Sequence, residues 1–388
     1  MKKLLSLALA LLLLAVMLQV VSMADEITWE ESKNVYWQAG DTSGQTATLA
    51  EALKAAYMAN KGDITITCRP NSDVGSLTHG HVADNITIIG NGAYISGGEC
   101  DLEVDTYMFS RDTGLQAESG GAYLEKEITI TASNLYNLGV WGQRHTNYTV
   151  NINLTNCDSK EISGKENVQR IYITGTTGVN NITVKDCDFL TTACALYSNA
   201  DGTVVIDNCT FNGGQVPVNF NHKASGAQTV TVKNCTFTNC GDASIVYAAP
   251  VRFVNSGDGS LDATIENNTF TGTVGNNGDI LLGDYREGKE SHDVTATITP
   301  NGTTKVRNSG TTDLPQTITG KVTADAKGNI TPVKEEGPTT IVIISPTQDT
   351  PKTDDQKNPT TGANDLVAVA VATAALALAG SAIILRKD

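Results

Sequence analysis

Three acidic residues in the stretch CDLEVDT could bind a cation or carry out acid–base chemistry. Asp101, Glu103 and Asp105 alternate with apolar residues, so on an extended strand all three side chains would point to one face. Carboxylate oxygens on one face could hold Ca²⁺, and a pair of them could serve as general acid and base. The same alternation is typical of the solvated face of an ordinary strand. We therefore treat the three residues as a candidate ligand or calcium site, and we assign no catalytic residue, no other metal and no cofactor.

A second group of residues, near the C-terminus, has the pattern of a covalent anchoring signal. The pentapeptide NPTTG consists of Asn358, Pro359, Thr360, Thr361 and Gly362. It precedes an uninterrupted apolar stretch at 366–385, long enough for a helix to cross a bilayer, and then a basic end. This order resembles the sorting signal of Gram-positive surface proteins, whose usual pattern is Leu-Pro-x-Thr-Gly, although Asn358 replaces the Leu. A plain membrane tail is the alternative.

The resemblance implies that a sortase recognises the pentapeptide and cleaves between Thr361 and Gly362. Thr361 would then be joined to peptidoglycan. The apolar stretch would hold the chain in the membrane only until that cleavage. The partners expected from this signal are therefore a sortase and peptidoglycan, at the outer surface of a Gram-positive bacterium.

The N-terminus carries the matching export signal. Lys2 and Lys3 precede an apolar run at 4–21, and cleavage after Ala24 would remove a signal peptide at 1–24. An N-terminal membrane anchor is the alternative. Together with the C-terminal signal, this stretch predicts a secreted, wall-anchored protein.

Composition excludes one class of partner and favours one class of structure. The formal net charge is −15, and nucleic-acid binding depends on Lys and Arg neutralising phosphates, so we expect no nucleic-acid partner. Charged residues make up 18% and aromatic residues 5% of the chain, which holds 36 Gly. This bias favours many short strands and tight turns over helices.

A repeated motif indicates how these strands are arranged. Each copy has two apolar residues one apart, then a polar pair, and often Thr-Phe. The first apolar residues of successive copies lie 22 to 42 residues apart, which is typical of stacked repeats with insertions. They are Ile64, Ile86, Ile128, Ile152, Ile182, Val204, Val230, Ala263 and Ala296.

The motif predicts a strand followed by a bend. Apolar and polar residues alternate at positions one to four, and the apolar residue then returns at position eight. Asn or Asp at position five tolerates the left-handed backbone that such a bend needs. Over roughly residues 45–310 the pattern resembles the right-handed parallel β-helix, also called the pectin-lyase-like fold. The expected class is therefore all-β, a solenoid whose coils pair in parallel.

Three positions of the motif should form rows along the solenoid. At position four, Lys and acidic residues alternate in sign, which supports the register. We expect positions five and six to form core ladders of like side chains. Position five holds Asn156, Asp186, Asn208, Asn234 and Asn267; position six holds Asn91, Ser133, Cys157, Cys187, Cys209, Cys235 and Asn268.

The cysteines in the position-six row could be oxidised or free. Neighbouring coils would bring their Cα atoms close enough for disulfides, but the Asn and Ser residues in the same row make small size an equal explanation. We expect free, buried thiols. We expect no zinc, since a straight row of sulfurs does not converge tetrahedrally.

The ends of the solenoid need caps, because open sheet edges invite aggregation. Residues 46–63 predict an amphipathic helix ended by Gly62, with Leu49, Leu53, Ala56 and Tyr57 on one face. The expected domains are a signal peptide at 1–24, an N-terminal cap at 25–63, the β-helix at 64–310, a terminal hairpin or cap at 311–335, a wall-spanning spacer at 336–357, and the sorting signal at 358–388.

Two function classes fit this organisation. The first is a wall-anchored surface protein that displays a rigid β-helix for adhesion, contacting glycans or a host surface, with the charged loop 283–293 suited to contact. The second, which the pectin-lyase-like resemblance raises, is a lyase or glycoside hydrolase acting on acidic polysaccharide. The catalytic signatures of pectate lyases and polygalacturonases are missing from the sequence, so we favour the first.

Overall fold

The computed structural model describes residues 27–60, 62–77, 84–96, 101–103, 126–142, 148–159, 171–173, 178–190, 193–284, 293–308 and 315–334. The chain divides into two compact units, Met1–Pro346 and Thr347–Asp388, and every described residue belongs to the first. The predicted signal peptide, spacer and sorting signal lie outside the described residues. Among those that are described, no helix is long and apolar enough to cross a membrane.

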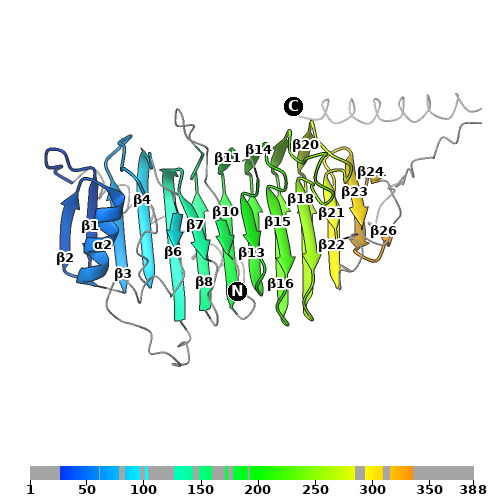
Figure 1. Ribbon diagram of the computed structural model, residues 1–388, viewed down its shortest axis with the longest axis horizontal. Coiled ribbons are helices and arrows are strands. Elements are labelled where there is room, and N and C mark those ends of the chain that lie inside the picture. Colours follow the sequence, from blue (N-terminus) through cyan, green and yellow to red (C-terminus); the bar gives the residue numbers. More distant parts are fainter. Residues whose placement is uncertain are drawn as a thin grey trace, which may run out of the picture. The chain divides into compact units, whose positions relative to one another are not determined.

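Most of the described residues form parallel β-strands in large sheets (Figure 1). The largest, which we call the long sheet, has thirteen strands. In spatial order these are β2 (Thr42–Thr46), β1 (Val35–Ala39), β3 (Asp63–Cys68), β4 (Asn85–Tyr94), β6 (Lys126–Tyr136), β8 (Tyr148–Thr155), β10 (Val179–Lys185), β13 (Gly202–Asp207), β16 (Ala227–Lys233), β19 (Ser260–Glu266), β22 (Val294–Thr299), β25 (Val322–Asp325) and β26 (Ile330–Pro332).

Two smaller sheets complete the fold, one of nine strands and one of four. The nine-stranded sheet contains β24 (Gln316–Ile318), β23 (Thr304–Asn308), β21 (Ile280–Leu282), β18 (Val251–Asn255), β15 (Val218–His222), β12 (Leu196–Ser198), β9 (Ile171–Ile173), β7 (Gly139–Gly142) and β5 (Asp101–Glu103). The four-stranded sheet contains β11 (Asp188–Leu190), β14 (Thr210–Asn212), β17 (Thr236–Thr238) and β20 (Thr269–Thr271).

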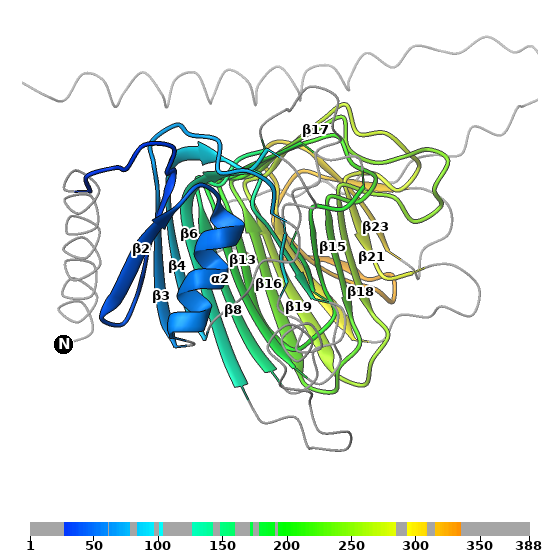
Figure 2. The ribbon, with the colours of Figure 1, turned by 60° about the vertical axis from the view of Figure 1, so that its left-hand side comes forward.

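From β10 to β21 the chain visits the three sheets in turn. β10 lies in the long sheet, β11 in the four-stranded sheet and β12 in the nine-stranded sheet, and β13 then returns to pair with β10. We call each such circuit a coil. Figure 2 shows the strands of the long sheet across from β15, β18 and β21. The buried side chains between the sheets form one continuous core, which is compatible with the predicted β-helix.

The predicted register is confirmed for most copies of the motif. Ile152 pairs with Ile182, Ile182 with Val204, and Val204 with Val230. The register continues through Ala263 to Ala296, and Ile64 pairs with Ile86. Each residue in the row buries its side chain in the core, which stabilises the fold by roughly 1.5–3 kcal/mol for a large aliphatic residue.

One copy of the motif was assigned wrongly. Ile128 pairs with Val150, and Ile130 is the residue that pairs with both Ile86 and Ile152. The stretch ITITASN offers two equally apolar starting residues, two apart, that both face inward. Asn134 decides between them, because its left-handed backbone (φ 51°) marks the bend four residues after Ile130. Ser133 therefore occupies position four, and Leu135 occupies position six.

The position-five row is confirmed as a bend but is wrong as a core ladder. Asn156, Asp186, Asn208, Asn234 and Asn267 all have φ between 51° and 56°. The four Asn side chains are exposed, and Asp186 is partly exposed. They bond to the preceding coil: Asn208 Nδ2 donates to Asp186 Oδ1 over 2.7 Å, and Asn234 Nδ2 donates to Asp207 Oδ1 over 2.9 Å. The left-handed bend points these side chains outward, so the row crosslinks coils at the surface.

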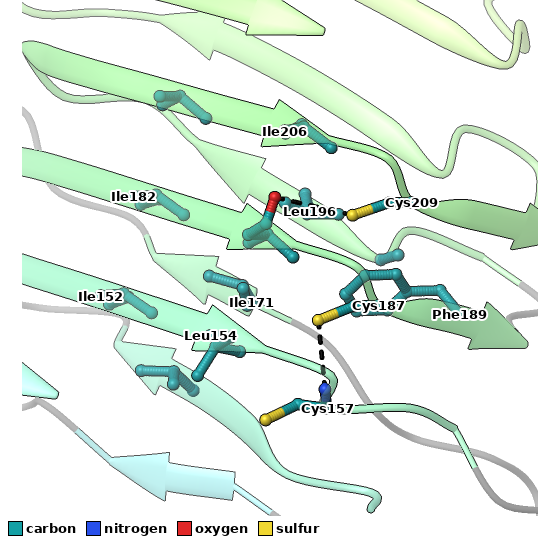
Figure 3. Close-up of a cluster of buried hydrophobic side chains, with 14 of the residues drawn as sticks. Ile152, Leu154, Cys157, Ile171, Ile182, Cys187, Phe189, Leu196, Ile206 and Cys209 are labelled. Carbon is teal, nitrogen blue, oxygen red and sulfur yellow. Dashed lines mark hydrogen bonds between the residues drawn. The ribbon is translucent and has the colours of Figure 1, made fainter. Parts of the chain in front are cut away.

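The cysteines and Asn268 of the position-six row are buried, as predicted, and the thiols bond along the stack. The prediction is wrong for Asn91, which takes a left-handed bend itself (φ 52°) and is only partly buried. Cys157, Cys187, Cys209 and Cys235 are at most 1% exposed, and all seven described cysteines are free. The backbone N–H of Cys157 donates to Cys187 Sγ over 3.3 Å, and Cys209 Sγ donates to the Val184 carbonyl over 3.6 Å (Figure 3). Figure 3 shows three of these side chains on successive coils, beside Phe189. The small side chains thus link each coil to the next.

Stacked phenylalanines line the core under the four-stranded sheet. The ring centroids of Phe189 and Phe211 are 5.2 Å apart, those of Phe211 and Phe237 are 4.8 Å apart, and those of Phe237 and Phe270 are 5.0 Å apart. Each stacked pair contributes about 0.5–1.5 kcal/mol beyond the area it buries. This row explains the recurring Thr-Phe of the motif.

The N-terminal end of the long sheet is closed by a helix and by antiparallel strands. Helix α2 (Leu49–Ala59) lies within the predicted range, but its C-cap is Asn60, and Gly62 lies beyond its end. Thr48 and Glu51 form a capping box at its start. Its buried residues include Leu49, Leu53 and the remaining residues of the predicted apolar face.

Both ends of the long sheet change from parallel to antiparallel pairing. β1 pairs antiparallel with β2 and β3, while β25 pairs antiparallel with β22 and β26. The last strand, β26, includes Pro332, which lacks a backbone donor. These features oppose edge-to-edge growth of the sheet.

Candidate binding surface

One row of register positions crosses the nine-stranded sheet; its two tyrosines, Asn219 and Arg307 are partly exposed, while Arg252 and Leu281 are buried. Its members are cross-strand partners from β5 to β23, and the residues flanking them, such as Val140 and Ile171, are buried. The row holds Glu103, Trp141, Tyr172, Tyr197, Asn219, Arg252, Leu281 and Arg307. We call it the aromatic row. It combines aromatic rings, an amide and guanidinium groups on one face of a rigid sheet.

Two tyrosines stack at the centre of the aromatic row. The rings of Tyr172 and Tyr197 have centroids 4.6 Å apart and an interplanar angle of 17°. Both side chains are partly exposed. Burial, followed by the neighbouring Tyr172, raises the pKa of Tyr197 to about 12. A phenol is protonated at neutral pH and can donate a hydrogen bond.

Arg252 contacts three neighbouring side chains. Its Nη1 donates to Asn219 Oδ1 over 3.2 Å, and its Nη2 pairs with Asp284 Oδ2 over 3.0 Å. Its guanidinium carbon lies 5.0 Å from the centre of the Tyr247 ring. The side chains of Arg252 and Asp284 are only 6% and 4% exposed. A buried guanidinium held through both of its terminal nitrogens fixes the position of the groups around it.

Asn277 holds a loop beside the aromatic row. Arg307 Nη1 donates to Asn277 Oδ1 over 2.6 Å. The other end of the same amide, Asn277 Nδ2, donates to the carbonyls of Val246 and Ala248 over 3.0 and 2.7 Å. These bonds flank Tyr247, so the loop between β17 and β18 presents that ring in a fixed place, next to Arg252.

The loop 283–293, predicted to be charged and exposed, is anchored at both of its ends. Asp284 is buried against Arg252, which corrects the prediction for the start of the loop. Asp293 is 71% exposed and pairs with Lys327 over 3.1 Å. The residues between them, 285–292, lie outside the described residues.

The candidate carboxylates fall at the edge of the same sheet. Asp101 and Glu103 belong to β5, where Glu103 pairs with Trp141 and thereby takes its register position in the aromatic row. Asp105 and the pentapeptide at 358–362 lie outside the described residues. Within the residues that the structure describes, no group of three His, Cys, Asp or Glu side chains could hold a metal ion.

Sequence reasoning missed most of the aromatic row. Tyr172, Asn219 and Arg252 each sit between two apolar residues, in IYI, VNF and VRF, and Tyr197 sits between Leu196 and the buried Ser198. These second apolar pairs follow the main motif once per coil, and this recurrence is the signal that could have found them. Asp284 carries no such signal, because it is 32 residues from Arg252 in sequence and contacts it only in the folded chain.

In comparisons with known proteins, no family, no curated protein and no solved structure matches this chain.

Proposed function

We propose that the chain is a secreted right-handed parallel β-helix, anchored to the cell wall through Asn358–Gly362 by a sortase, that binds extended glycans through the aromatic row. The fold part rests on the circuit through three sheets and on the confirmed register of Ile152, Ile182 and Val204. The anchoring part rests on the order of export signal, pentapeptide, apolar stretch and basic end.

The observation that carries the binding proposal is the Tyr172–Tyr197 stack beside the engaged Arg252. Tyrosine and arginine are enriched at binding surfaces, because each offers a flat apolar body together with hydrogen-bonding groups. Members of the row are one strand apart, about 4.8 Å, along the direction in which the coils stack. A linear polymer of sugar rings can lie across the partly exposed Tyr172, Tyr197 and Asn219, and it offers hydroxyl groups to their phenols and amide.

Glycan binding by variants of the secreted chain tests this proposal. We expect Tyr172→Ala and Tyr197→Ala to weaken binding to any glycan found on an array roughly tenfold or more. The matched control is Tyr36→Ala, which removes a partly exposed tyrosine from the long sheet. Equal binding by all three variants, or no glycan bound by the parent chain, would overturn the proposal.

A reducing-end assay separates this proposal from the enzyme alternative. Enzyme-like release of reducing ends from pectins or mucin glycans would replace it with a polysaccharide-cleaving function. Asp101, Glu103 and Asp105 would then be the residues to change.

Fractionation of cells tests the anchoring part. The parent chain should be released only by digestion of peptidoglycan, while Thr361→Ala should leave it in the membrane fraction. Recovery of the parent chain from the membrane by detergent alone would support the plain membrane tail instead.

A further inference from the structure

Two amide side chains lie inside the core, in a row that is otherwise apolar. Asn180 pairs with Val150, while Gln228 pairs with Gly202 on one side and Leu261 on the other. Asn180 and Gln228 are both 0% exposed. Because neighbouring coils fill the same level with Val and Leu, these amides need a specific explanation.

The nitrogen atoms of both amides have partners at one turn. Asn180 Nδ2 donates to Ser198 Oγ over 2.9 Å. Gln228 Nε2 donates to the Ala200 carbonyl over 2.8 Å and lies 3.4 Å from Ser198 Oγ. The carbonyl of Ala200 can only accept, so it fixes which end of the Gln228 amide is nitrogen.

The oxygen atoms of the same amides have no partner in the protein. Asn180 Oδ1 and Gln228 Oε1 are both buried without a hydrogen bond. Leaving a buried acceptor unsatisfied costs about 1–3 kcal/mol, and such groups usually bond to an internal water.

Gly202 keeps a protein side chain out of this level of the core. Its φ is +124°, and a Cβ atom there would collide with the carbonyl of Asn180. An L-residue is therefore strained at this position. The coil between Asn180 and Gln228 consequently contributes no side chain to the row.

We propose that one water molecule is bound inside the core between Asn180, Ser198 and Gln228. Ser198 Oγ accepts from both amide nitrogens, so its own O–H is available to donate. The water accepts from that hydroxyl and donates to Asn180 Oδ1 and Gln228 Oε1. These three hydrogen bonds are the usual number for a buried water.

Water suits this site better than a monovalent cation. A cation requires lone pairs from every ligand, whereas the hydroxyl of Ser198 presents a proton once its lone pairs are engaged. If the Asn180 amide is turned over, it presents N–H groups instead of an oxygen. A water can then accept from it and still donate to Gln228, but a cation cannot.

A crystal structure of the full chain, grown with and without thallium ions, tests the proposal directly. We expect one isolated density peak within hydrogen-bonding distance of the three side chains, with no anomalous signal in thallium. An empty site, or a peak that scatters anomalously, would overturn the proposal.

Water relaxation dispersion in solution provides a second test on the same chain. The double variant N180V/Q228L uses the residue types that Val150 and Leu261 bring to this level, and it should lose one long-lived internal water. The matched control Gln45→Leu removes a partly exposed amide and should lose none. An unchanged count in the double variant would overturn the proposal. If that variant does not fold, the density in the parent chain decides.

Discussion

The side chain of Asn268 continues the bonding pattern of Cys235, one coil further along. Cys235 Sγ donates to the carbonyl of Ile206 over 3.8 Å, and Asn268 Nδ2 donates to the carbonyl of Val232 over 2.8 Å. Both carbonyls occupy position three of the preceding coil. Asn268 Oδ1 also accepts from the N–H of Cys235 over 2.8 Å, as Cys187 Sγ does from Cys157. Thiol and amide therefore perform the same coil-to-coil role.

This equivalence predicts that Cys235→Asn is tolerated. The new amide can bond to the Ile206 carbonyl and to the preceding N–H, so we expect the free energy of unfolding to stay within about 1 kcal/mol of the parent. Cys235→Val, which removes the hydrogen bonds, should be about 1–2 kcal/mol less stable. Urea unfolding measures both. A valine variant as stable as the asparagine variant would contradict the shared role.

The buried thiols also predict a loss of stability in alkali. Burial raises the pKa of Cys68 and Cys157 to about 12 from 9.0. In the unfolded chain these thiols ionise near pH 9 while the folded protein keeps them protonated. Their contribution to stability is therefore complete below pH 9 and is lost as the pH rises toward 12.

Guanidinium midpoints between pH 8 and 12 measure this dependence. A variant carrying Cys68→Ala and Cys157→Ala should start less stable but show a shallower fall above pH 9. An equally steep fall in that variant would assign the alkaline loss to other groups, among which the buried thiols of Cys187, Cys209 and Cys240, whose pKa values are also raised, are the first candidates.

The long sheet could be predicted because its motif recurs along the chain and its strands are long enough to show alternating apolar and polar residues. Val204 and Val230 were placed correctly since the bends at Asn208 and Asn234 fix the count within each motif. The count failed at Ile128, where a two-residue shift leaves the alternation unchanged and only the bend distinguishes the two choices. Periodicity fixes which face a residue occupies but leaves the register open in steps of two.

The candidate surface was largely beyond prediction, because its strands are short and its contacts are long-range. β9 and β12 have three residues each, too few for a periodic signal. Arg252 and Asp284 are 32 residues apart in sequence, and the insertion between them sets their contact. The outward direction of the position-five Asn side chains was also missed, because composition alone does not show to which side a left-handed bend turns its residue.

His222 links three coils, and its loss should destabilise the fold. It is 0% exposed, its Nε2 lies 2.8 Å from Asp201 Oδ1, and its Nδ1 lies 3.3 Å from Asn255 Oδ1. His222→Leu would remove both contacts, at a cost of about 1–3 kcal/mol. His222→Gln, which can still donate, should lose less. Thermal unfolding compares the two, and equal losses would show that the ring is needed for packing alone.

The final prediction concerns the buried pair of Arg252 and Asp284. Removing one member leaves a buried charge unpaired, so Arg252→Met should lower the free energy of unfolding by about 3–5 kcal/mol. The double variant R252M/D284L buries no charge and should recover most of that loss. A double-mutant cycle in urea measures the coupling. The control is the exposed pair Lys327 and Asp293, with side chains 67% and 71% exposed, whose coupling should not exceed about 1 kcal/mol. If the two cycles give equal coupling energies, Arg252 does not fix the aromatic row. If the stable double variant also loses glycan binding while Tyr172 and Tyr197 stay in place, Arg252 contacts the ligand itself.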